Sequence, residues 1–309
     1  MTWCLASKNE YIDIVAPSGT IAASGLTSID TMLQKLNLRA RIPENILGVH
    51  PFSAQTDAVR FALLQQALMA EDSTIVWCVR GGHGVSRIMP ELIYLPKPNK
   101  QKILIGFSDI SSLHLWLNQA WQWPSIHGPG ARQSAEGEIA AEDVAALYQL
   151  AFAGLTDYKI SGLMPLNAAA QNLTQVSGIT AGGCISVLQT SIGTPWQLDG
   201  RDKILFLEDV NEKPYRIDRA LVHLADAGIF NQAQAIIFGD FGEHTEESST
   251  IDWVLKEAIP NYLTQYHHTI PLFRLRGFGH GAHNKPLPFG VPATLTMQES
   301  LAQLVFSAE

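Results

Sequence analysis

Cysteine is scarce in this chain, and the few cysteines form no recognisable pattern. Among 309 residues there are three, Cys4, Cys78 and Cys184, at wide spacing and without a CxxC pair. An odd number at such spacing argues against a disulfide framework and against a thiolate metal site. We therefore expect the protein to reside in a reducing compartment.

Charged residues and long apolar runs are also in short supply. Charged residues make up 16% of the chain, the net charge is -8, and no run of lysine or arginine occurs. These features argue against a nucleic acid partner. No apolar run approaches the roughly 18 residues of a membrane helix, and the first ten residues lack the basic and apolar regions of a signal peptide. We expect a cytoplasmic protein with no membrane partner.

Motifs for nucleotide cofactors and catalytic metals are missing as well. Neither G-x-G-x-x-G nor the P-loop pattern is present, and HExxH is absent. The pair His280-x-x-His283 has ligand-like spacing, but two histidines in a loop match such a pattern easily by chance. We expect neither a metal nor a cofactor.

What is present is the layout of an α/β protein. The length exceeds the usual limit of a single hydrophobic core, and 46% apolar residues argue against disorder. Short apolar runs alternate with helical patterns, which is typical of a parallel sheet covered by helices. We predict an N-terminal open parallel-sheet domain over 1–130, a helix and linker over 131–175, and a smaller C-terminal α/β domain over 176–309.

The most informative motif is Ile105-Gly106-Phe107-Ser108-Asp109-Ile110, which follows a predicted strand. A serine on such a sharp turn has its Oγ lifted clear of the sheet, and the next backbone N–H can stabilise an oxyanion at a helix N-terminus. The G-x-S-x-G pattern of a nucleophile elbow is incomplete, because Ile110 occupies the second glycine position. Ser108 is therefore either a nucleophile or a turn serine that caps a helix.

A serine nucleophile needs a base and an acid that orients the base. His280 lies between Gly279 and Gly281, so its loop can approach another segment closely; a surface histidine is the alternative. Glu208 ends a strongly apolar strand, where an unpaired carboxylate is costly. It could orient the base or form a structural ion pair with Lys203 or Arg216, and Asp209 competes with it on the opposite strand face.

A second glycine cluster, Arg80-Gly81-Gly82-His83-Gly84, follows another predicted strand and resembles an anion-binding nest. The backbone of Gly81 or Gly82 could supply an oxyanion donor, while a tight turn without a ligand is the alternative. Arg80 could hold a substrate carboxylate or brace the turn. His127, in Ile126-His127-Gly128-Pro129, could contact substrate or only shape its loop.

Seven stretches, in order, resemble the LD-carboxypeptidases, the S66 family of serine peptidases, over nearly the whole chain. They are Ile14-Val15-Ala16-Pro17-Ser18-Gly19, Arg80-Gly81-Gly82-His83-Gly84, Gly106-Phe107-Ser108-Asp109-Ile110, His127-Gly128-Pro129, Leu207-Glu208-Asp209-Val210, Pro214-Tyr215-Arg216-Ile217-Asp218-Arg219, and Gly279-His280 followed by Leu287-Pro288-Phe289-Gly290.

The resemblance implies a serine carboxypeptidase that releases the terminal D-alanine of murein tetrapeptides during cell-wall recycling, with a murein peptide as its partner and a homodimer as its assembly. It implies Ser108 as nucleophile, His280 as general base and Glu208 as the orienting carboxylate. The implied oxyanion donors are the backbone N–H groups of Gly82 and Asp109. Arg80, His83 and His127 are the candidate substrate contacts.

Two departures and two alternatives accompany this interpretation. The family often has an aromatic residue at the position of His83 and an asparagine at that of Cys184. Some members instead hydrolyse aminoacyl-nucleotide antibiotics and tend to carry an extra loop that stacks on the nucleobase. The region 131–195 contains no tryptophan, so an aromatic platform of this kind is not evident, although Tyr158 or Phe152 could also stack on a base. A non-catalytic protein that binds a small ligand between two domains is the alternative from a different class.

Overall fold

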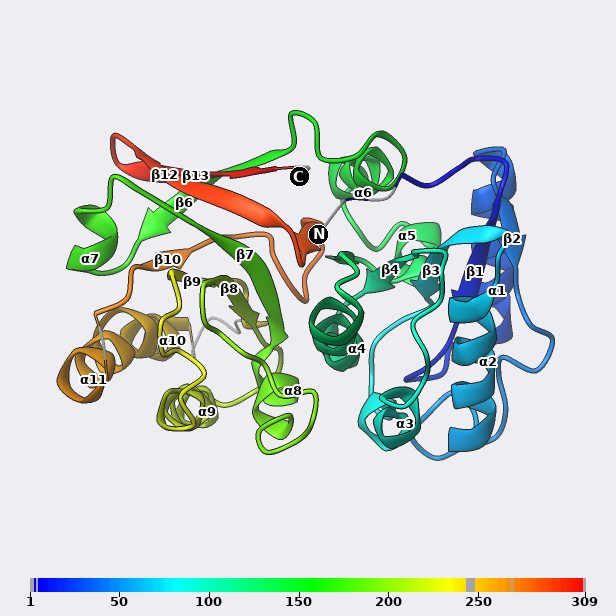
Figure 1. Cartoon of the computed structure of the whole chain (residues 1–309), viewed down its shortest axis with the longest axis horizontal. Helices are drawn as coiled ribbons and strands as arrows, with labels where there is room; N and C mark the ends of the chain where they lie inside the picture. The colour runs from blue at the N-terminus through cyan, green and yellow to red at the C-terminus, as the bar shows by residue number, and fades with distance from the viewer. Residues whose placement is uncertain (1–2, 4, 243–247, 268, 308–309) are drawn as a thin grey trace. The chain divides into compact units, whose positions relative to one another are not determined.

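The chain folds into two compact units. A computed structural model describes all residues except 1–2, 4, 243–247, 268 and 308–309, so Cys4 lies outside the described residues. The first unit is Met1–Gly154 together with Asn284–Gly290, and the second is Leu155–His283 together with Val291–Glu309 (Figure 1). A short segment near the C-terminus thus belongs to the first unit, although it lies inside the range 176–309 expected for the second domain.

The first unit alternates strands and helices from its first strand to its fifth. Its elements are β1 (Tyr11–Val15), α1 (Ala23–Lys35), β2 (Arg39–Arg41), α2 (Asp57–Met69), β3 (Ser73–Cys78), α3 (Val85–Leu92), β4 (Ile103–Gly106), η1 (Ser108–Ile110), α4 (Ser111–Trp116), η2 (Leu117–Trp121), β5 (Ser125–His127), α5 (Ala131–Ala135), α6 (Ala141–Ala153) and β11 (Leu287–Phe289).

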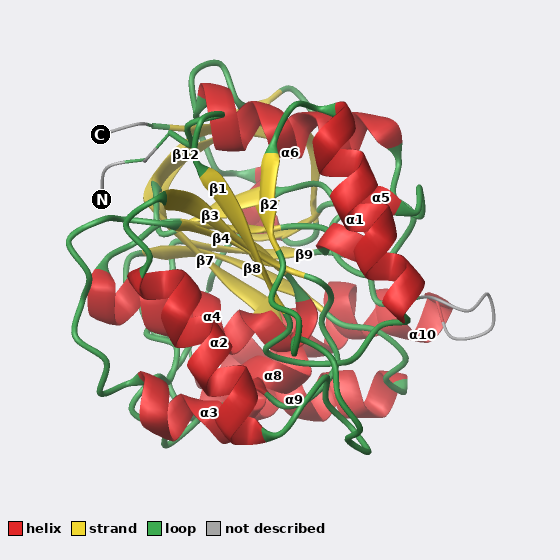
Figure 2. Cartoon of the chain, turned by 90° about the vertical axis from the view of Figure 1, so that its right-hand side faces the viewer, coloured by secondary structure: helices red, strands yellow, loops and turns green. Residues whose placement is uncertain are grey.

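These strands form one sheet in the order β11-β5-β4-β3-β1-β2. Strands β1 to β5 run parallel, and β11 adds an antiparallel edge. Strands β3 and β4 are buried along their whole length, as expected when helices cover both faces of a parallel sheet. Figure 2 shows α1, α5 and α6 on one face and α2, α3 and α4 on the other. The predicted parallel-sheet layout is confirmed.

The second unit combines a barrel of β-strands with several helices. Its elements are β6 (Lys159–Pro165), α7 (Ala168–Gln171), β7 (Gln175–Cys184), α8 (Ile185–Thr190), β8 (Lys203–Glu208), α9 (Pro214–Asp226), β9 (Ala235–Phe238), α10 (Ser248–Trp253), η3 (Val254–Ala258), α11 (Ile259–Tyr266), β10 (Leu272–Arg274), β12 (Pro292–Gln298) and β13 (Leu301–Phe306).

The second sheet closes in the order β10-β6-β13-β12-β7-β8-β9. The part formed by β7, β8, β9 and β10 is parallel, whereas β6, β12 and β13 pair antiparallel. Strands β9 and β10 are buried along their whole length, and β7 is buried only in its second half. Along β13 buried positions alternate with more exposed ones, which is the pattern of a strand with one solvated face. The predicted second α/β region is confirmed, and its closure into a barrel is an additional feature.

The polar segment 166–172, which we interpreted as a linker, is structured. The strand β6 precedes it, and α7 occupies most of it, with the Asn167 side chain accepting a hydrogen bond from the Ala170 N–H at 3.0 Å. Asn167 is therefore a helix cap, a role that small polar residues often take and that resembles a loop in sequence. In the described parts of the chain, no helix combines the length and the apolar character needed to cross a membrane.

Candidate active site

Ser108 lies at the carboxyl end of β4, where the strand turns into η1. Its φ of 63° is positive, an unusual conformation for a residue with a side chain. The turn is closed by the Ile110 N–H, which donates to the Phe107 carbonyl at 3.2 Å. A Cβ on Gly106 would lie 2.9 Å from Ile110 Cγ2, so the isoleucine at the second glycine position of the motif packs against the first glycine. The elbow therefore has a compact, internally packed form.

Two neighbouring loops approach Ser108 within the first unit. A Cβ on Gly81 would lie 2.5 Å from Ser108 Cβ, and one on Gly82, whose φ is 127°, would lie 2.9 Å from Gly19 Cα. The Gly19 N–H also donates to the Gly81 carbonyl at 3.1 Å. Because β1, β3 and β4 are parallel neighbours, their following loops meet at one edge of the sheet, where open α/β sheets bind ligands. Glycine is required here by close backbone approach.

The Asp109 side chain joins the same three loops. One of its carboxylate oxygens accepts hydrogen bonds from the Ser18 hydroxyl at 2.6 Å and from the Val85 N–H at 2.9 Å. Asp109 is buried. Burial raises the pKa of its carboxyl group, against the hydrogen bonds from Ser18 and Val85, which lower it. Sequence reasoning considered only the backbone of Asp109, and the Ser18 in the matching stretch after β1 was the overlooked signal.

The backbone N–H groups of Gly82 and Asp109 are the candidate oxyanion donors in this region. Neither N–H has a hydrogen-bond acceptor among the residues that the structure describes. The Asp109 N–H lies in the first turn of η1, where helical N–H groups have no partner within the helix. The first unit thus brings Ser108, Gly82 and Asp109 together.

His114, which sequence reasoning missed, contacts the backbone of the elbow that carries Ser108. Its ring nitrogens lie 2.9 Å from the Gly106 carbonyl oxygen and 2.8 Å from the Ser125 hydroxyl. Burial, together with the neighbouring His127, lowers the pKa of His114 to about 3, so the ring stays neutral. One of its nitrogens then donates to Gly106, two residues before Ser108, while the other meets the Ser125 hydroxyl.

The second unit brings Glu208 and His280 together. Glu208 ends β8 and is fully buried, and its Oε2 lies 2.6 Å from His280 Nδ1. Gly279, with a φ of 114°, allows this contact because a Cβ there would lie 2.7 Å from Glu208 Oε2. Two hydrogen bonds with Asp240 secure the loop that carries His280: the Gly277 N–H donates to the Asp240 carboxylate at 2.8 Å, and the Asp240 N–H donates to the Phe278 carbonyl at 2.8 Å.

The carboxylate controls the protonation of the imidazole. Burial lowers the pKa of His280. The charge of Glu208 and the hydrogen bond between Glu208 and His280 raise it by a larger amount, so the pKa lies above the usual value of 6.5. When Nδ1 donates its proton to Glu208, the neutral ring has its lone pair on Nε2. The pair therefore orients the imidazole so that its neutral form can act as a base through Nε2.

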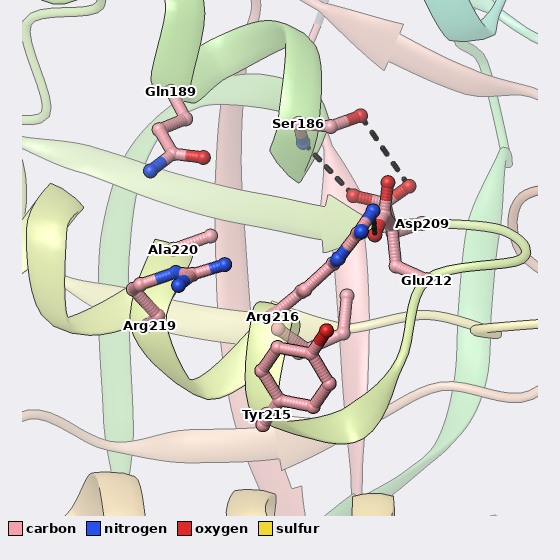
Figure 3. A pocket seen from close by; sticks show the side chains of 9 residues that line it. Ser186, Gln189, Asp209, Glu212, Tyr215, Arg216, Arg219 and Ala220 are labelled. Carbon is pink, nitrogen blue, oxygen red and sulfur yellow. Dashed lines mark hydrogen bonds and ion pairs between the residues drawn. The ribbon is translucent and has the colours of Figure 1, made fainter.

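Asp209, which competed with Glu208 in the sequence, makes different contacts. Its carboxylate accepts hydrogen bonds from the Ser186 N–H at 2.9 Å and from the Val210 N–H at 2.8 Å. It therefore caps the start of α8. Burial raises its pKa to about 6, and the nearby Glu208 adds to the rise. Arg216, one of the two alternative partners that we considered for Glu208, instead forms an ion pair with Glu212 at 3.3 Å (Figure 3).

The candidate substrate contacts differ in accessibility. Arg80 is exposed and its guanidinium reaches the Thr20 carbonyl at 3.4 Å, while exposed His83 packs edge-on against Phe52 with ring centroids 6.2 Å apart. His127 is fully buried in the first unit, with its ring centroid 5.4 Å from that of Phe289. Packing covers the whole side chain of His127 in this structure, and its contact with substrate stays a prediction.

One of the two departures from the family pattern, Cys184, and one candidate platform for a nucleobase, Tyr158, are both buried. Cys184 is buried, and burial together with the charges of Glu208 and Asp209 raises the pKa of its thiol well above the usual value, which keeps it protonated. Tyr158, a candidate platform for a nucleobase, is buried against Phe306 with ring centroids 5.6 Å apart. Among the described residues, no group of three or more His, Cys, Asp or Glu side chains is arranged to hold a metal ion.

A serine on a strand-to-helix elbow and a buried carboxylate–imidazole pair are the parts that serine hydrolases use. Comparison with known proteins gives the family. Residues 12–128 match the model of the LD-carboxypeptidase N-terminal domain, and residues 177–295 match that of the LD-carboxypeptidase C-terminal domain. The chain belongs to the LD-carboxypeptidase family, as its motifs suggested.

Individual relatives span nearly the whole chain. A protein of Rickettsia conorii that is named as a carboxypeptidase is 39% identical over 91% of this chain and 86% of its own length. The murein tetrapeptide carboxypeptidase of Pseudomonas aeruginosa is 29% identical over 92% of both chains. The crystal structure of muramoyltetrapeptide carboxypeptidase from Oxalobacter formigenes superposes with a TM-score of 0.78 at 25% identity, covering 96% of this chain and 98% of that one.

A microcin C7 self-immunity protein shares the fold as well. It superposes with a TM-score of 0.77 at 17% identity, over 100% of this chain and 99% of that one. At this level of identity, the likeness describes the fold alone.

Proposed function

We propose that this protein is a serine-type LD-carboxypeptidase that releases the terminal D-alanine from murein tetrapeptides, with Ser108, His280 and Glu208 as its catalytic triad. The observation that carries the proposal is the 2.6 Å contact between His280 Nδ1 and Glu208, which leaves Nε2 as a base. Support comes from the elbow that presents Ser108 and from relatives that are named as murein peptide carboxypeptidases.

The proposed acylation step uses Ser108 and His280. Ser108 Oγ attacks the carbonyl carbon of the L-centred diamino acid, while its proton passes to His280 Nε2. The resulting oxyanion accepts hydrogen bonds from the N–H groups of Gly82 and Asp109. When the C–N bond breaks, His280 gives its proton to the amine of D-alanine, and the diamino acid stays bound to Ser108 as an ester.

The proposed deacylation step repeats this proton transfer with water. His280 takes a proton from a water molecule that attacks the ester carbonyl, and then returns it to Ser108 Oγ as the peptide leaves. Glu208 stays ionised throughout and stabilises the imidazolium that forms in each step. The scheme needs no metal or cofactor. A homodimer and a cytoplasmic location stay predictions.

The test offers the purified protein a murein tetrapeptide and, separately, an aminoacyl nucleotide, with and without a chelator. We expect D-alanine release that survives the chelator and falls by about 10⁴-fold in Ser108→Ala, the usual scale of triad loss. An alanine at position 108 would adopt the same positive φ as Ser108, at the same conformational cost. The melting temperature of the variant should therefore match that of the parent.

Three results would contradict the proposal. Full activity in Ser108→Ala would remove the nucleophile, and cleavage of the aminoacyl nucleotide alone would assign the chain to the antibiotic-cleaving members of the family. Binding of the tetrapeptide without any hydrolysis would favour a non-catalytic binding protein.

A further inference from the structure

Arg60, near the start of α2, is a buried arginine that takes no part in the proposed proton transfers. It is 2% exposed, and burial of a guanidinium is costly unless hydrogen bonds and an opposite charge satisfy it. Its Nη2 pairs with Asp57 Oδ1 at 2.5 Å, and its Nε donates to the Gln55 carbonyl at 3.1 Å. Its Nη1 donates to two further carbonyls, that of Pro17 and, at 2.9 Å, that of Gly84. The side chain therefore joins α2 to the loops that follow β1 and β3.

Arg60 and Asp109 hold one peptide group of the second loop from opposite sides. The Gly84 carbonyl accepts from Arg60 at 2.9 Å, and the N–H of the same peptide group, which belongs to Val85, donates to Asp109 Oδ2 at 2.9 Å. No peptide bond among the described residues is cis, so this carbonyl and this N–H point in opposite directions. The cation lies at the negative end of the peptide dipole and the anion at its positive end. Both charges therefore favour a single orientation of this peptide group.

The loop after β1 is held by the same two side chains. Arg60 donates to the Pro17 carbonyl, and the hydroxyl of the next residue, Ser18, donates to Asp109 Oδ2 at 2.6 Å. A positive and a negative side chain thus fix adjacent residues in each of the two loops. The loops cannot shift independently without breaking a hydrogen bond to a charged group, which is among the stronger hydrogen bonds in proteins.

Gly82, a candidate oxyanion donor, lies between two held points of its loop. On one side the Gly81 carbonyl accepts from the Gly19 N–H at 3.1 Å, and on the other the Gly84 carbonyl accepts from Arg60 at 2.9 Å. Glycine has more backbone freedom than any other residue, and Gly82 has a φ of 127°. A fixed direction of the Gly82 N–H therefore requires that its neighbours are held.

We propose that Arg60 is a positioning residue of the reaction, which fixes the direction of the Gly82 N–H by holding the Gly84 carbonyl and the Pro17 carbonyl. The inference rests on the proposed function, in which the Gly82 N–H stabilises the oxyanion that forms when Ser108 attacks. A hydrogen-bond donor contributes most when it already points at the position of the developing charge. Loss of the guanidinium should therefore lower kcat and leave KM nearly unchanged.

The experiment compares Arg60→Lys with Arg41→Lys. Lysine keeps the positive charge beside Asp57, but its ammonium group cannot replace a planar fork that reaches four acceptors. Arg41 is the matched control because this arginine of the same unit pairs with Asp13 at 2.5 Å and Asp72 at 2.8 Å, which lie outside both loops. D-alanine release from the murein tetrapeptide gives kcat and KM, well below the melting temperature of each protein.

We expect Arg60→Lys to lower kcat by about ten- to a hundredfold, up to the loss of one oxyanion donor, with KM within about twofold of the parent. Arg41→Lys should change neither constant, even where its melting temperature falls. Hydrogen exchange, followed by mass spectrometry, is a second readout that needs no substrate. Amides in 16–20 and 80–86 should exchange faster in Arg60→Lys than in the parent, and not in Arg41→Lys.

Asp57→Asn replaces Arg60→Lys if the lysine variant does not fold. The amide oxygen can still accept from Arg60, but without its charge the hydrogen bond is about half as strong, so the guanidinium is less firmly held. We expect kcat to fall about threefold at constant KM, with faster exchange in the same two segments. Asp72→Asn, which removes one carboxylate partner of Arg41, is its control and should leave kcat unchanged.

An unchanged kcat in the folded variant, or a fall in kcat that its control shares, would overturn the assignment. A rise in KM at constant kcat would overturn it too, because Arg60 would then act in substrate binding. If the parent hydrolyses no tetrapeptide, the proposed function fails, and hydrogen exchange decides the role of Arg60. Faster exchange in the two segments then supports its hold on the loops, and unchanged exchange ends the proposal.

Discussion

The two halves of the proposed triad are held in different ways. In the first unit, Ser108 is placed by backbone: a positive φ, glycines in close approach, and a carboxylate that ties three loops together. In the second unit, His280 is placed by a buried charge, because Glu208 at the end of β8 holds its Nδ1 at 2.6 Å. The first half should therefore be sensitive to added atoms, and the second to removed charge.

This difference also separates local from distant information in the sequence. The elbow is built within six residues of chain, Ile105 to Ile110. The pair of Glu208 and His280 joins residues 72 positions apart, and only the strand end and the flanking glycines signal it. Backbone-placed groups are therefore easier to find from a motif than charge-placed groups.

Glu208→Gln should have the largest effect in the second unit, about 10³–10⁴-fold in kcat, because the amide cannot hold the imidazole in its productive tautomer or stabilise the imidazolium. The pH dependence sharpens this expectation. The parent should lose kcat/KM as pH falls through the raised pKa of His280, and the variant should lose it at lower pH, because burial then acts without the opposing charge.

The measurement is a pH–rate profile of D-alanine release for both proteins, extended by a stability profile. The folded pKa of His280 is raised, so its contribution to stability is complete below its ordinary pKa of about 6.5 and is lost as pH rises through the folded pKa. Glu208→Gln should lose this dependence. An acid limb that does not move between parent and variant would show that Glu208 does not control His280.

Gly81→Ala should have the next largest effect, and it tests the backbone-placed half. The new Cβ would lie 2.5 Å from Ser108 Cβ, so either the elbow or its neighbouring loop must shift. A displacement of this size at the nucleophile should lower kcat about 10²-fold. D-alanine release measures the loss.

The control for this variant is Gly137→Ala. Gly137 has a φ of 72°, and an added Cβ there meets nothing within 4 Å. It should reduce stability by about 1 kcal/mol, the usual size of a backbone conflict, and leave kcat unchanged. Equal activity losses in the two variants would show that strain, and not the approach to Ser108, determines the effect.

Much of the first unit could be predicted because its patterns are local. The strand over Tyr11–Val15 and the elbow at Ser108 follow from apolar runs that end in glycine turns. The closure of the barrel could not be predicted, because it depends on pairing of β6 with β10 and β13, which lie more than 100 residues away in the chain. Strand β11 likewise pairs with β5 from a distant part of the sequence.

The same distinction between local and distant sequence information applies to the candidate site. Ser108, Glu208 and His280 could be chosen as candidates from the sequence because each occupies a special position on a strand end or a glycine loop. The side-chain role of Asp109 was not accessible, since its partner Ser18 lies 91 residues earlier. The burial of His127 also depends on Phe289 from the distant β11, so a loop histidine in sequence became a packed one in the fold.

Asp109→Ala should have the smallest effect of the three variants, and it examines whether a side chain contributes to the backbone-placed half. Removal of the carboxylate leaves the Ser18 hydroxyl and the Val85 N–H without their acceptor in a buried place. This should lower stability by about 1–3 kcal/mol. The three loops would also lose their common anchor, so we expect kcat to fall about tenfold, a positioning effect well below that of a triad residue.

Asp109→Asn separates positioning from charge, because an amide oxygen can accept both hydrogen bonds that the carboxylate oxygen accepts. If the role is positioning, the asparagine variant should recover most of the kcat lost in Asp109→Ala, with KM nearly constant in both. A change in KM without a change in kcat would instead place Asp109 in substrate binding. Thermal melting of all three proteins shows whether stability and kcat recover together, as a shared anchor for the Ser18, Val85 and Ser108 loops requires.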